Sequence, residues 1–209
     1  IKTRAVPQAD GSYKLSGTKI FITAGEHDLA DNIIHLVLAK LPDAPAGPRG
    51  ISLFLVPKMR VDEAGELTGE RNGVRCGSIE HKMGIKASPT CVMNFDEATG
   101  YLVGELNNGL SHMFTMMNYE RLSMGLQANG LADSAYQTAA AYAKERVQGR
   151  APTGAQQPEA NADPLLVHPD VRRLLLTIRA NVLAGRALSI FAAMQLDVSR
   201  FHADAEVRL

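Results

Sequence analysis

The hydrophobic pattern of this 209-residue chain changes its period once, near residue 106. Before that point, short apolar runs rich in β-branched residues, such as NIIHLVLAK and GISLFLVPK, are bounded by Pro, Gly or Asp, which is typical of strands. After it, apolar residues recur at steps of three and four, which places them on one face of a helix. We therefore expect two regions of different structural class.

The first region, residues 1–106, predicts a small β-domain built as an antiparallel barrel or sandwich, because several short strands are separated by Gly- and Pro-containing turns. The segment YKLSGTKIFIT predicts two extended runs joined by a turn at Ser16-Gly17. The segments TCVMNFDEA and GYLVGE predict two more strands. The stretch LPDAPAGPRG predicts a surface loop on its composition.

The second region, residues 107–209, predicts two long antiparallel helices and makes the whole chain an α+β protein. The first helix is expected to run from Gly109 to about Arg146, a length of roughly 50 Å. The second is expected to start near His168, with Pro at its first turn. Its apolar stripe is wide, so we expect part of a four-helix bundle whose exposed faces are covered by further helices or subunits.

Composition and charge exclude several classes of protein. Lys and Arg total 22 and Asp and Glu total 22, and this balance argues against a general nucleic-acid binder. No unbroken apolar run approaches the roughly 18 residues of a membrane helix, so no membrane span is expected. Cys76 and Cys91 form no CxxC pair, which predicts no metal site and two reduced thiols in a cytoplasmic protein. The chain opens with Ile1 and no Met, so we expect a piece of a longer protein.

Several motifs in a fixed order resemble the acyl-CoA dehydrogenase family, specifically its middle β-domain and the first part of its C-terminal helical domain. The motifs NYERLSMG and KERVQGR lie near the start and the end of the long helix, and HPDVRRLLLTIRA follows a polar insert. This last arrangement resembles a longer bacterial branch, which includes enzymes that act on 3-methylthiopropanoyl-CoA and fatty acyl-CoAs. The remaining matches are FITAG (21–25), ADN (30–32), KMGIKASPTCVMNFDEA (82–98) and GELNNGL (104–110).

The resemblance assigns the FIT segment to FAD. It implies that the Phe21 ring packs along the isoalloxazine, that Ile22 offers its backbone, and that Thr23 offers its hydroxyl near flavin N5. A rotatable hydroxyl suits N5, which changes from acceptor to donor on reduction. The family's usual Trp and Asn are Phe21 and Ala24 here, which removes two polar contacts.

The resemblance places the end of the long helix at the FAD pyrophosphate of a neighbouring subunit. Arg146 and Gln148 would then bind phosphate, and the fork of Arg fits phosphate oxygens. FAD binding would require a homodimer or homotetramer. Here the sequence QGR lacks the family's Phe before Gly, so the turn is one residue shorter.

Two neighbouring residues of the long helix match substrate-side positions. Arg121 matches a position that contacts the CoA part of the substrate. Glu120 matches the position of the catalytic base in a minority of members, whereas most place the base in the last helices, which here would lie beyond Leu209. From the residues alone, Glu120 is expected to be a helix-face carboxylate paired with Lys or Arg.

The activity implied by the resemblance is FAD-dependent α,β-dehydrogenation of an acyl-CoA thioester to trans-2-enoyl-CoA, as in fatty acid β-oxidation. Electrons would pass to an electron-transferring flavoprotein. Two alternatives stay open at this point. One is an acyl-CoA oxidase-type flavoenzyme, which differs in oxygen access to reduced flavin. The other is a non-catalytic truncated module without flavin.

Overall fold

The computed structural model describes residues 1–208 and divides into two compact units, Ile1–Met116 and the chain from Met117 onward. The division falls inside the first long helix, ten residues after the boundary that the change of period predicts. The assignment of residues 1–106 and 107–209 to two domains stays a prediction. Each unit is described below by itself.

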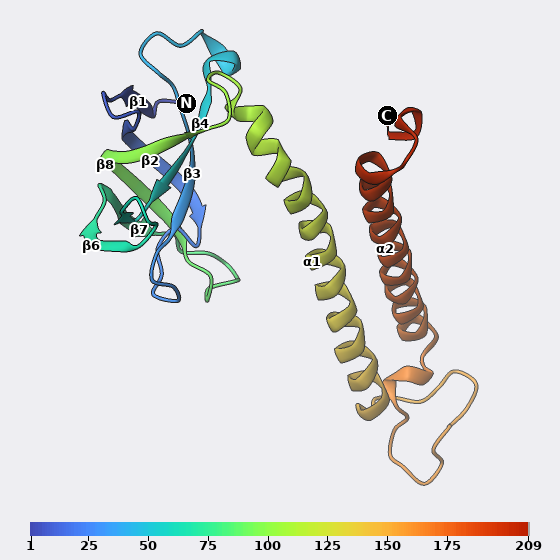
Figure 1. Ribbon diagram of the computed structural model, residues 1–209. Coiled ribbons are helices and arrows are strands. Elements are labelled where there is room, and N and C mark those ends of the chain that lie inside the picture. Colours follow the sequence, from blue (N-terminus) through green and yellow to red (C-terminus); the bar gives the residue numbers. More distant parts are fainter. Residues whose placement is uncertain (209) are drawn as a thin grey trace. The chain divides into compact units, whose positions relative to one another are not determined.

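The first unit consists of antiparallel β-structure and the first turns of a helix (Figure 1). The strands of its main sheet are hydrogen-bonded in the order β1-β2-β8-β4-β3, with β7 also paired to β8, and β5 and β6 form a separate hairpin. The strand bounds are β1 (Arg4–Pro7), β2 (Tyr13–Thr23), β3 (Ile34–Ala39), β4 (Ser52–Pro57), β5 (Met59–Val61), β6 (Leu67–Arg71), β7 (Val74–Ile79) and β8 (Thr90–Val103).

The sheet curls but does not close into a barrel. Its two ends meet only at one isolated bridge, Arg4 to Lys40, where the Ala5 N–H donates to the Lys40 carbonyl at 2.9 Å. β1 pairs with residues 13–16 of β2 only. Within the described residues, no strand therefore covers the outer edge of the second half of β2 or the outer edge of β3. The antiparallel α+β class is confirmed, and these two open edges distinguish the fold from a closed barrel.

The core of this unit follows the period of two that a strand imposes. In β3, His35, Val37 and Ala39 are buried, whereas Ile34 and Leu36 are exposed. Val37 and Ala39 belong to one buried apolar cluster with residues of the other strands. β3 therefore presents apolar residues on both of its faces. The largest members of the buried cluster are Leu15, Phe54, Val56, Val74 and Met93.

Two expectations for the strands were wrong in the same way. The expected turn at Ser16-Gly17 is a register shift within the single strand β2, and the two strands expected after residue 90 are the single strand β8. At Gly17 a Cβ would lie 2.9 Å from the Thr3 Cα, so glycine permits a close strand approach there. A glycine that signals a turn in sequence can equally mark a bulge. The expected loop at 41–50 contains one short 3-10 helix, η1 (Gly47–Gly50).

The long helix α1 (Gly109–Glu145) begins on the first unit. The Asn107 N–H donates to Ser52 Oγ at 2.8 Å, and the Gly109 N–H donates to the Ile51 carbonyl at 2.8 Å. These bonds satisfy N–H groups that a helix start otherwise leaves without partners. They fix the first turns of α1, which include Met113 and Met116, against the start of β4.

The second unit contains the rest of α1 and α2 (Pro169–Phe201), which run antiparallel, together with η2 (Leu165–Val167) and η3 (Ala205–Arg208) (Figure 1). Arg186 donates to Asp133 at 3.0 Å, and Arg179 donates to the Tyr136 hydroxyl at 3.2 Å, so polar contacts join the helices. α1 begins and ends close to the predicted residues, and α2 begins close to the predicted His168. The other two helices of the predicted bundle stay a prediction.

α2 buries little of its apolar surface within this chain. Val182 is its only buried residue, whereas Leu188 is 67% exposed and Phe191 is 55% exposed. By length and composition alone, α2 is apolar enough to cross a membrane, with a mean hydropathy of 1.4 over 18 residues. The sequence analysis missed this helix because it considered only unbroken apolar runs. The mean hydropathy of an 18-residue window can stay high even when the window contains up to two charged residues. This is weak evidence for a span, since core helices of soluble proteins pass the same test.

Candidate functional site

The FIT segment lies on a β-bulge near the end of β2. Lys19 pairs with Met93 and Ile22 pairs with Cys91. The pairing therefore advances three residues along β2 for two residues along β8, which places one extra residue in β2. The extra residue leaves Phe21 with a φ of 59°, a left-handed conformation that is costly for an aromatic residue. The Phe21 side chain is 67% exposed. Bulges of this kind re-aim side chains beside binding sites, and the strain here exposes an apolar ring.

The turn after the bulge is held tightly to the rest of the sheet. The Ala24 N–H donates to the Pro89 carbonyl at 2.8 Å, and the Gly25 N–H donates to the Ile22 carbonyl at 3.3 Å. A Cβ at Gly25 would lie 2.9 Å from Met93 Sδ, so only glycine fits without a shift. These contacts fix the backbone on both sides of Thr23 and leave its side chain exposed.

A cavity of about 400 Å³ lies beside Thr23. Residues of both β2 and β3 line it, on the strands whose outer edges are unpaired. The Lys19 Nζ donates to the Leu38 carbonyl at 2.7 Å, and burial lowers the Lys19 pKa. Within the described residues, the Thr23 hydroxyl makes no hydrogen bond. The full lining is Lys19, Ile22, Thr23, the five residues from Ile34 to Leu38, Phe95, Met113 and Met116.

The cavity wall contains one buried histidine. His35 is 7% exposed, and its ring meets Phe95 edge-on at 6.0 Å between centroids. Its Nε2 has no hydrogen-bond partner within the described residues. Burial lowers the pKa of His35, partly offset by the charge of Glu26, so the neutral ring is favoured. The cavity therefore offers the Thr23 hydroxyl in a largely apolar surround, with the buried His35 ring in its wall.

The loop that follows the FIT segment is fixed by an ion-pair network. Glu26 pairs with Lys58, and the Arg71 guanidinium donates to its other oxygen at 2.7 Å. Burial opposes the charged carboxylate, but the hydrogen bonds and charges of Lys58 and Arg71 outweigh it and lower the Glu26 pKa. Asn32 adds a reciprocal pair of bonds with the Met59 backbone. The loop is thereby tied to the ends of β4 and β6.

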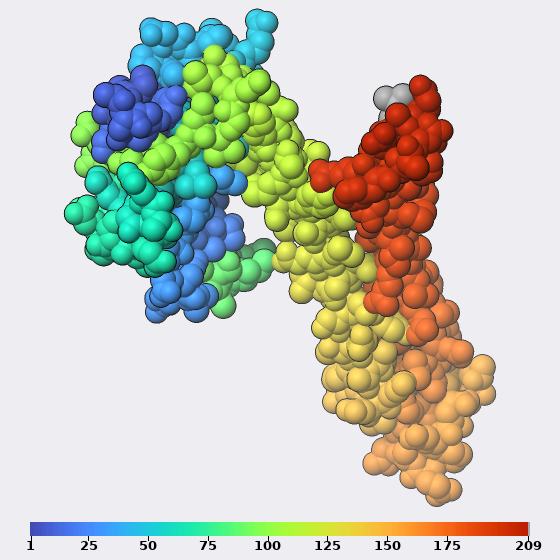
Figure 2. Space-filling model, viewed as in Figure 1, coloured from blue at the N-terminus to red at the C-terminus, as the bar shows by residue number. Residues whose placement is uncertain are grey.

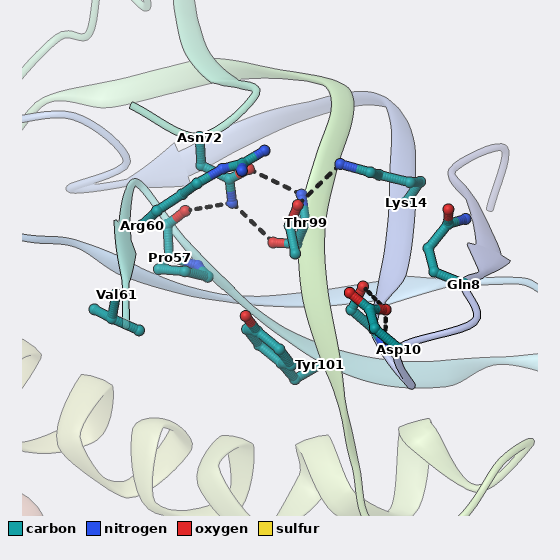
Figure 3. Close-up of a pocket in the computed structure, with 10 residues that line it drawn as sticks. Gln8, Asp10, Lys14, Pro57, Arg60, Val61, Asn72, Thr99 and Tyr101 are labelled. Atoms are coloured by element: carbon teal, nitrogen blue, oxygen red, sulfur yellow. Dashed lines mark hydrogen bonds between the residues drawn. The ribbon is translucent and has the colours of Figure 1, made fainter. Parts of the chain in front are cut away.

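A second cavity, of about 270 Å³, lies at the other end of β2 (Figure 3). Its polar groups are largely satisfied by one another. The buried Asn72 amide donates to the carbonyls of Pro57 and Thr99, both at 2.8 Å, and Lys14 donates to the Thr99 hydroxyl at 3.0 Å. Such bonds hold strands together. The cavity beside Thr23, whose exposed hydroxyl has no partner within the described residues, is the better candidate for a ligand site.

The other predicted cofactor residues belong to the second unit. Arg146 and Gln148 follow the last turn of α1, and both side chains are exposed. Within the described residues, neither side chain makes a hydrogen bond or an ion pair, whereas the backbone N–H and carbonyl groups of both residues are hydrogen-bonded. Phe21, Ile22 and Thr23 are thus brought together in one unit, and Arg146 and Gln148 in the other.

The predicted substrate-side residues lie on α1. Glu120 and Arg121 are both exposed on this helix. In the described part of the chain Glu120 makes no ion pair, so the expected pairing with Lys or Arg is not formed. No group of three or more His, Cys, Asp or Glu side chains gathers as a metal site among the described residues.

The sequence argument missed the wall of the cavity opposite Thr23. Ile34, Leu36 and Leu38 come from the outer face of β3, and Met113 and Met116 come from the first turns of α1. One signal was present, because the run NIIHLVLAK does not alternate between apolar and polar residues. A strand with that pattern is covered on both faces.

Two family models match the chain in order. Residues 1–98 match the acyl-CoA dehydrogenase middle domain, and residues 107–158 match the acyl-CoA dehydrogenase C-terminal domain. Together the two matches cover most of the chain.

Individual proteins agree with these matches. The 3-methylmercaptopropionyl-CoA dehydrogenase of Ruegeria pomeroyi is 53% identical over 100% of this chain and 34% of its own length. The broad-specificity linear acyl-CoA dehydrogenase FadE5 of Mycobacterium tuberculosis is 44% identical over 95% of this chain and 33% of its own. The structure of an acyl-CoA dehydrogenase from Bacillus anthracis complexed with FAD superposes with a TM-score of 0.71 at 27% identity, covering 100% of this chain and 31% of that one.

The chain spans about a third of the length of the curated relatives it matches. The matches run through both units and through α2. The order of motifs, the antiparallel sheet and the long helices agree with these relatives. The chain belongs to the acyl-CoA dehydrogenase family.

Proposed function

We propose that this chain supplies the flavin-facing edge of an FAD-dependent acyl-CoA dehydrogenase. The observation that carries the proposal is the Thr23 hydroxyl, which ends a bulged strand, has no partner within the described residues and lies beside an apolar cavity. The names of the relatives and the FAD in one solved structure support it.

The residues around the cavity fit an isoalloxazine ring. A planar aromatic ligand needs apolar walls with a few placed polar groups. Here Ile22, Leu36 and Met116 give apolar surface, and Thr23 gives one hydroxyl. The exposed Phe21 ring on its strained backbone would pack on the ligand, which would give the strain a function.

Arg146 and Gln148 fit a phosphate ligand for a different reason. Their exposed side chains are a cation and an amide, and neither is used by the described chain. We propose that they bind the FAD pyrophosphate of a neighbouring subunit, so the active protein is a homodimer or homotetramer. Arginine binds phosphate through two parallel hydrogen bonds, which fixes orientation as well as charge.

The reaction we propose is α,β-dehydrogenation of an acyl-CoA thioester to a trans-2-enoyl-CoA. When bound beside Phe21 and Thr23, FAD would supply the hydride acceptor for the substrate β-hydrogen. The Thr23 hydroxyl can accept or donate at the flavin edge, and Phe21 excludes water from that edge. Arg121 would bind the CoA part. The α-proton would go to a carboxylate outside this chain, with Glu120 as the alternative base.

The remaining assignments follow from the same proposal. Electrons would leave to an electron-transferring flavoprotein, and the protein would act in fatty acid metabolism in the cytoplasm. We propose that α2 does not span a membrane. Its exposed apolar side chains would instead pack in a larger helical domain, as expected for a family member of about three times this length.

The test uses the full-length protein that carries this chain, purified with its bound cofactor. We expect bound FAD and reduction of an artificial electron acceptor on addition of an acyl-CoA. Thr23→Val should lower turnover and shift the visible flavin spectrum, whereas Thr23→Ser, which keeps the hydroxyl, should restore most of both. A protein without bound or bindable flavin would refute the proposal and favour a non-catalytic module. Fast reoxidation of the reduced protein in air would favour an oxidase.

A further inference from the structure

We propose that Asp163 is a positioning residue that holds the Arg146–Arg150 segment in the conformation that binds the FAD pyrophosphate. This inference rests on the proposed function of Arg146 and Gln148. It adds a residue that lies outside every motif of the resemblance, in the polar insert between the two long helices (orange in Figure 1).

The Asp163 carboxylate is fully buried and organises the insert around itself. Its Oδ2 accepts the Ala151 N–H at 2.9 Å. Its Oδ1 accepts the Gln157 N–H at 2.8 Å and the Gln156 N–H at 3.0 Å, and lies 3.5 Å from an Arg150 nitrogen. Three backbone donors and one guanidinium thus converge on one carboxylate, which satisfies it without water.

The backbone of the same residue fixes the segment after α1. The Gln148 N–H donates to the Asp163 carbonyl at 2.9 Å, and the Asp163 N–H donates to the Gly149 carbonyl at 2.9 Å. A bridge between Val147 and Pro164 lies beside these bonds. Asp163 therefore pairs with the segment through its main chain and closes the insert through its side chain.

Two more contacts complete the support. The Arg150 guanidinium donates to the Gln157 carbonyl at 2.9 Å and to the Ala160 carbonyl, which ties the two ends of the insert together. His168 Nε2 donates to the Gln148 carbonyl at 2.7 Å. The segment is held almost entirely through its backbone, so the Arg146 and Gln148 side chains remain available for a ligand.

This arrangement has the properties of a preorganised binding element. Ordering a loop on binding costs free energy, and a loop ordered beforehand avoids that cost. The hydrogen bond from Ala151, with those from Gln157 and Gln156, lowers the Asp163 pKa to about 2 against the opposing effect of burial. The carboxylate is therefore charged at every ordinary assay pH, and its charge faces backbone N–H groups.

The test is a double-mutant cycle on FAD affinity, measured by titrating full-length apoprotein with FAD. Asp163→Asn should weaken FAD binding roughly tenfold or more, as seen for residues that orient ligand-binding groups in metal sites. Arg146→Ala should also weaken it. If Asp163 acts through this segment, the two losses should not multiply. The FAD affinity of the double variant should then lie within about twofold of the affinity of whichever single variant binds FAD more weakly. Glu159→Gln is the matched control, because Glu159 lies exposed in the same insert and should change nothing.

A second readout needs no flavin. Amide hydrogen exchange in the apoprotein should accelerate at Ala151, Gln156 and Gln157 in Asp163→Asn and stay unchanged in Glu159→Gln. If Asp163→Asn does not fold, Arg150→Gln replaces it in the cycle, since it removes the clamp on the insert and should couple to Arg146→Ala in the same way.

The outcomes separate the two proposals. Full FAD affinity in Arg146→Ala would refute the phosphate role of the segment, and the inference with it. A loss in Arg146→Ala combined with wild-type affinity in Asp163→Asn, or with losses that multiply in the double variant, would overturn the positioning role alone. Faster exchange at these amides in Asp163→Asn without coupling to Arg146→Ala would show that Asp163 holds the insert but does not act through Arg146, and would also overturn the positioning role.

Discussion

The β-unit and the helical unit bury apolar surface to very different extents. In the β-unit, Leu15, Phe54 and Met93 are at most 1% exposed and belong to one core. In α2 (orange to red in Figure 2), Val182 alone is buried, and apolar side chains such as Leu188 remain open to solvent. The difference teaches that the first unit draws stability from its own core, whereas the second needs surface that the described residues do not supply.

The largest loss of stability should come from truncating a buried side chain in the core of the β-unit. Phe54→Ala should lower the free energy of unfolding by about 3–5 kcal/mol, because it removes a fully buried ring. Phe21→Ala, the same change at the exposed bulge, should alter it by only about 0.5 kcal/mol. Denaturant unfolding measures both. Equal losses would show that the ring of Phe21 is part of the core.

The helical unit should respond differently in two contexts. Leu188→Ala should cost about 2–4 kcal/mol in the full-length protein, where we expect the side chain to be covered. In the 209-residue chain alone the cost should be near zero, since Leu188 is 67% exposed. Thermal melts of both forms make the comparison. A small cost in both would mean that α2 is not a core helix.

The Glu26 network should contribute a smaller, pH-dependent share to the β-unit. Glu26→Gln should cost about 1 kcal/mol, the upper value for a partly exposed ion pair. The pKa of Glu26 is lowered in the folded state from its ordinary value of 4.5. Its stabilisation is therefore complete above that value and is lost as the pH falls below it. The variant and the wild type should converge in stability at acid pH, and a constant difference would contradict the assignment.

The smallest effect should be confined to the polar insert of the helical unit. The Asp163 pKa falls from 3.8 to about 2 on folding, so its stabilisation is present above pH 3.8 and is lost as the pH drops toward 2. Hydrogen exchange at Ala151, corrected for intrinsic rates, should accelerate across this window. Acceleration already at pH 5 would show that another group holds the insert.

The sequence supports the division into classes better than the details of the site. The change of period predicted the strands and both helices, because amphipathic patterns depend on local geometry. The turn predicted at Gly17 was wrong, since glycine occurs both in turns and in β-bulges. The strain at Phe21 and the pairing of Glu26 with Arg71 depend on strand register, which no local pattern encodes.

The residues of the candidate site also divide into those that a sequence motif predicts and those that only the fold brings together. Thr23 was found by its motif, whereas Leu36 and Met116 join it only because the fold brings β3 and the start of α1 to one cavity. Asp163 has no motif at all. Its role depends on a buried carboxylate meeting three backbone N–H groups, and a polar, Pro-containing insert gives no sign of that.

The most direct test of the central assignment is hydrogen–deuterium exchange on the full-length protein with and without FAD. If the bulged edge of β2 faces the flavin, added FAD should slow exchange at residues 20–25 and along β3 at residues 34–38. Unchanged exchange in both segments, in a protein that demonstrably binds FAD, would place the flavin elsewhere and contradict the account.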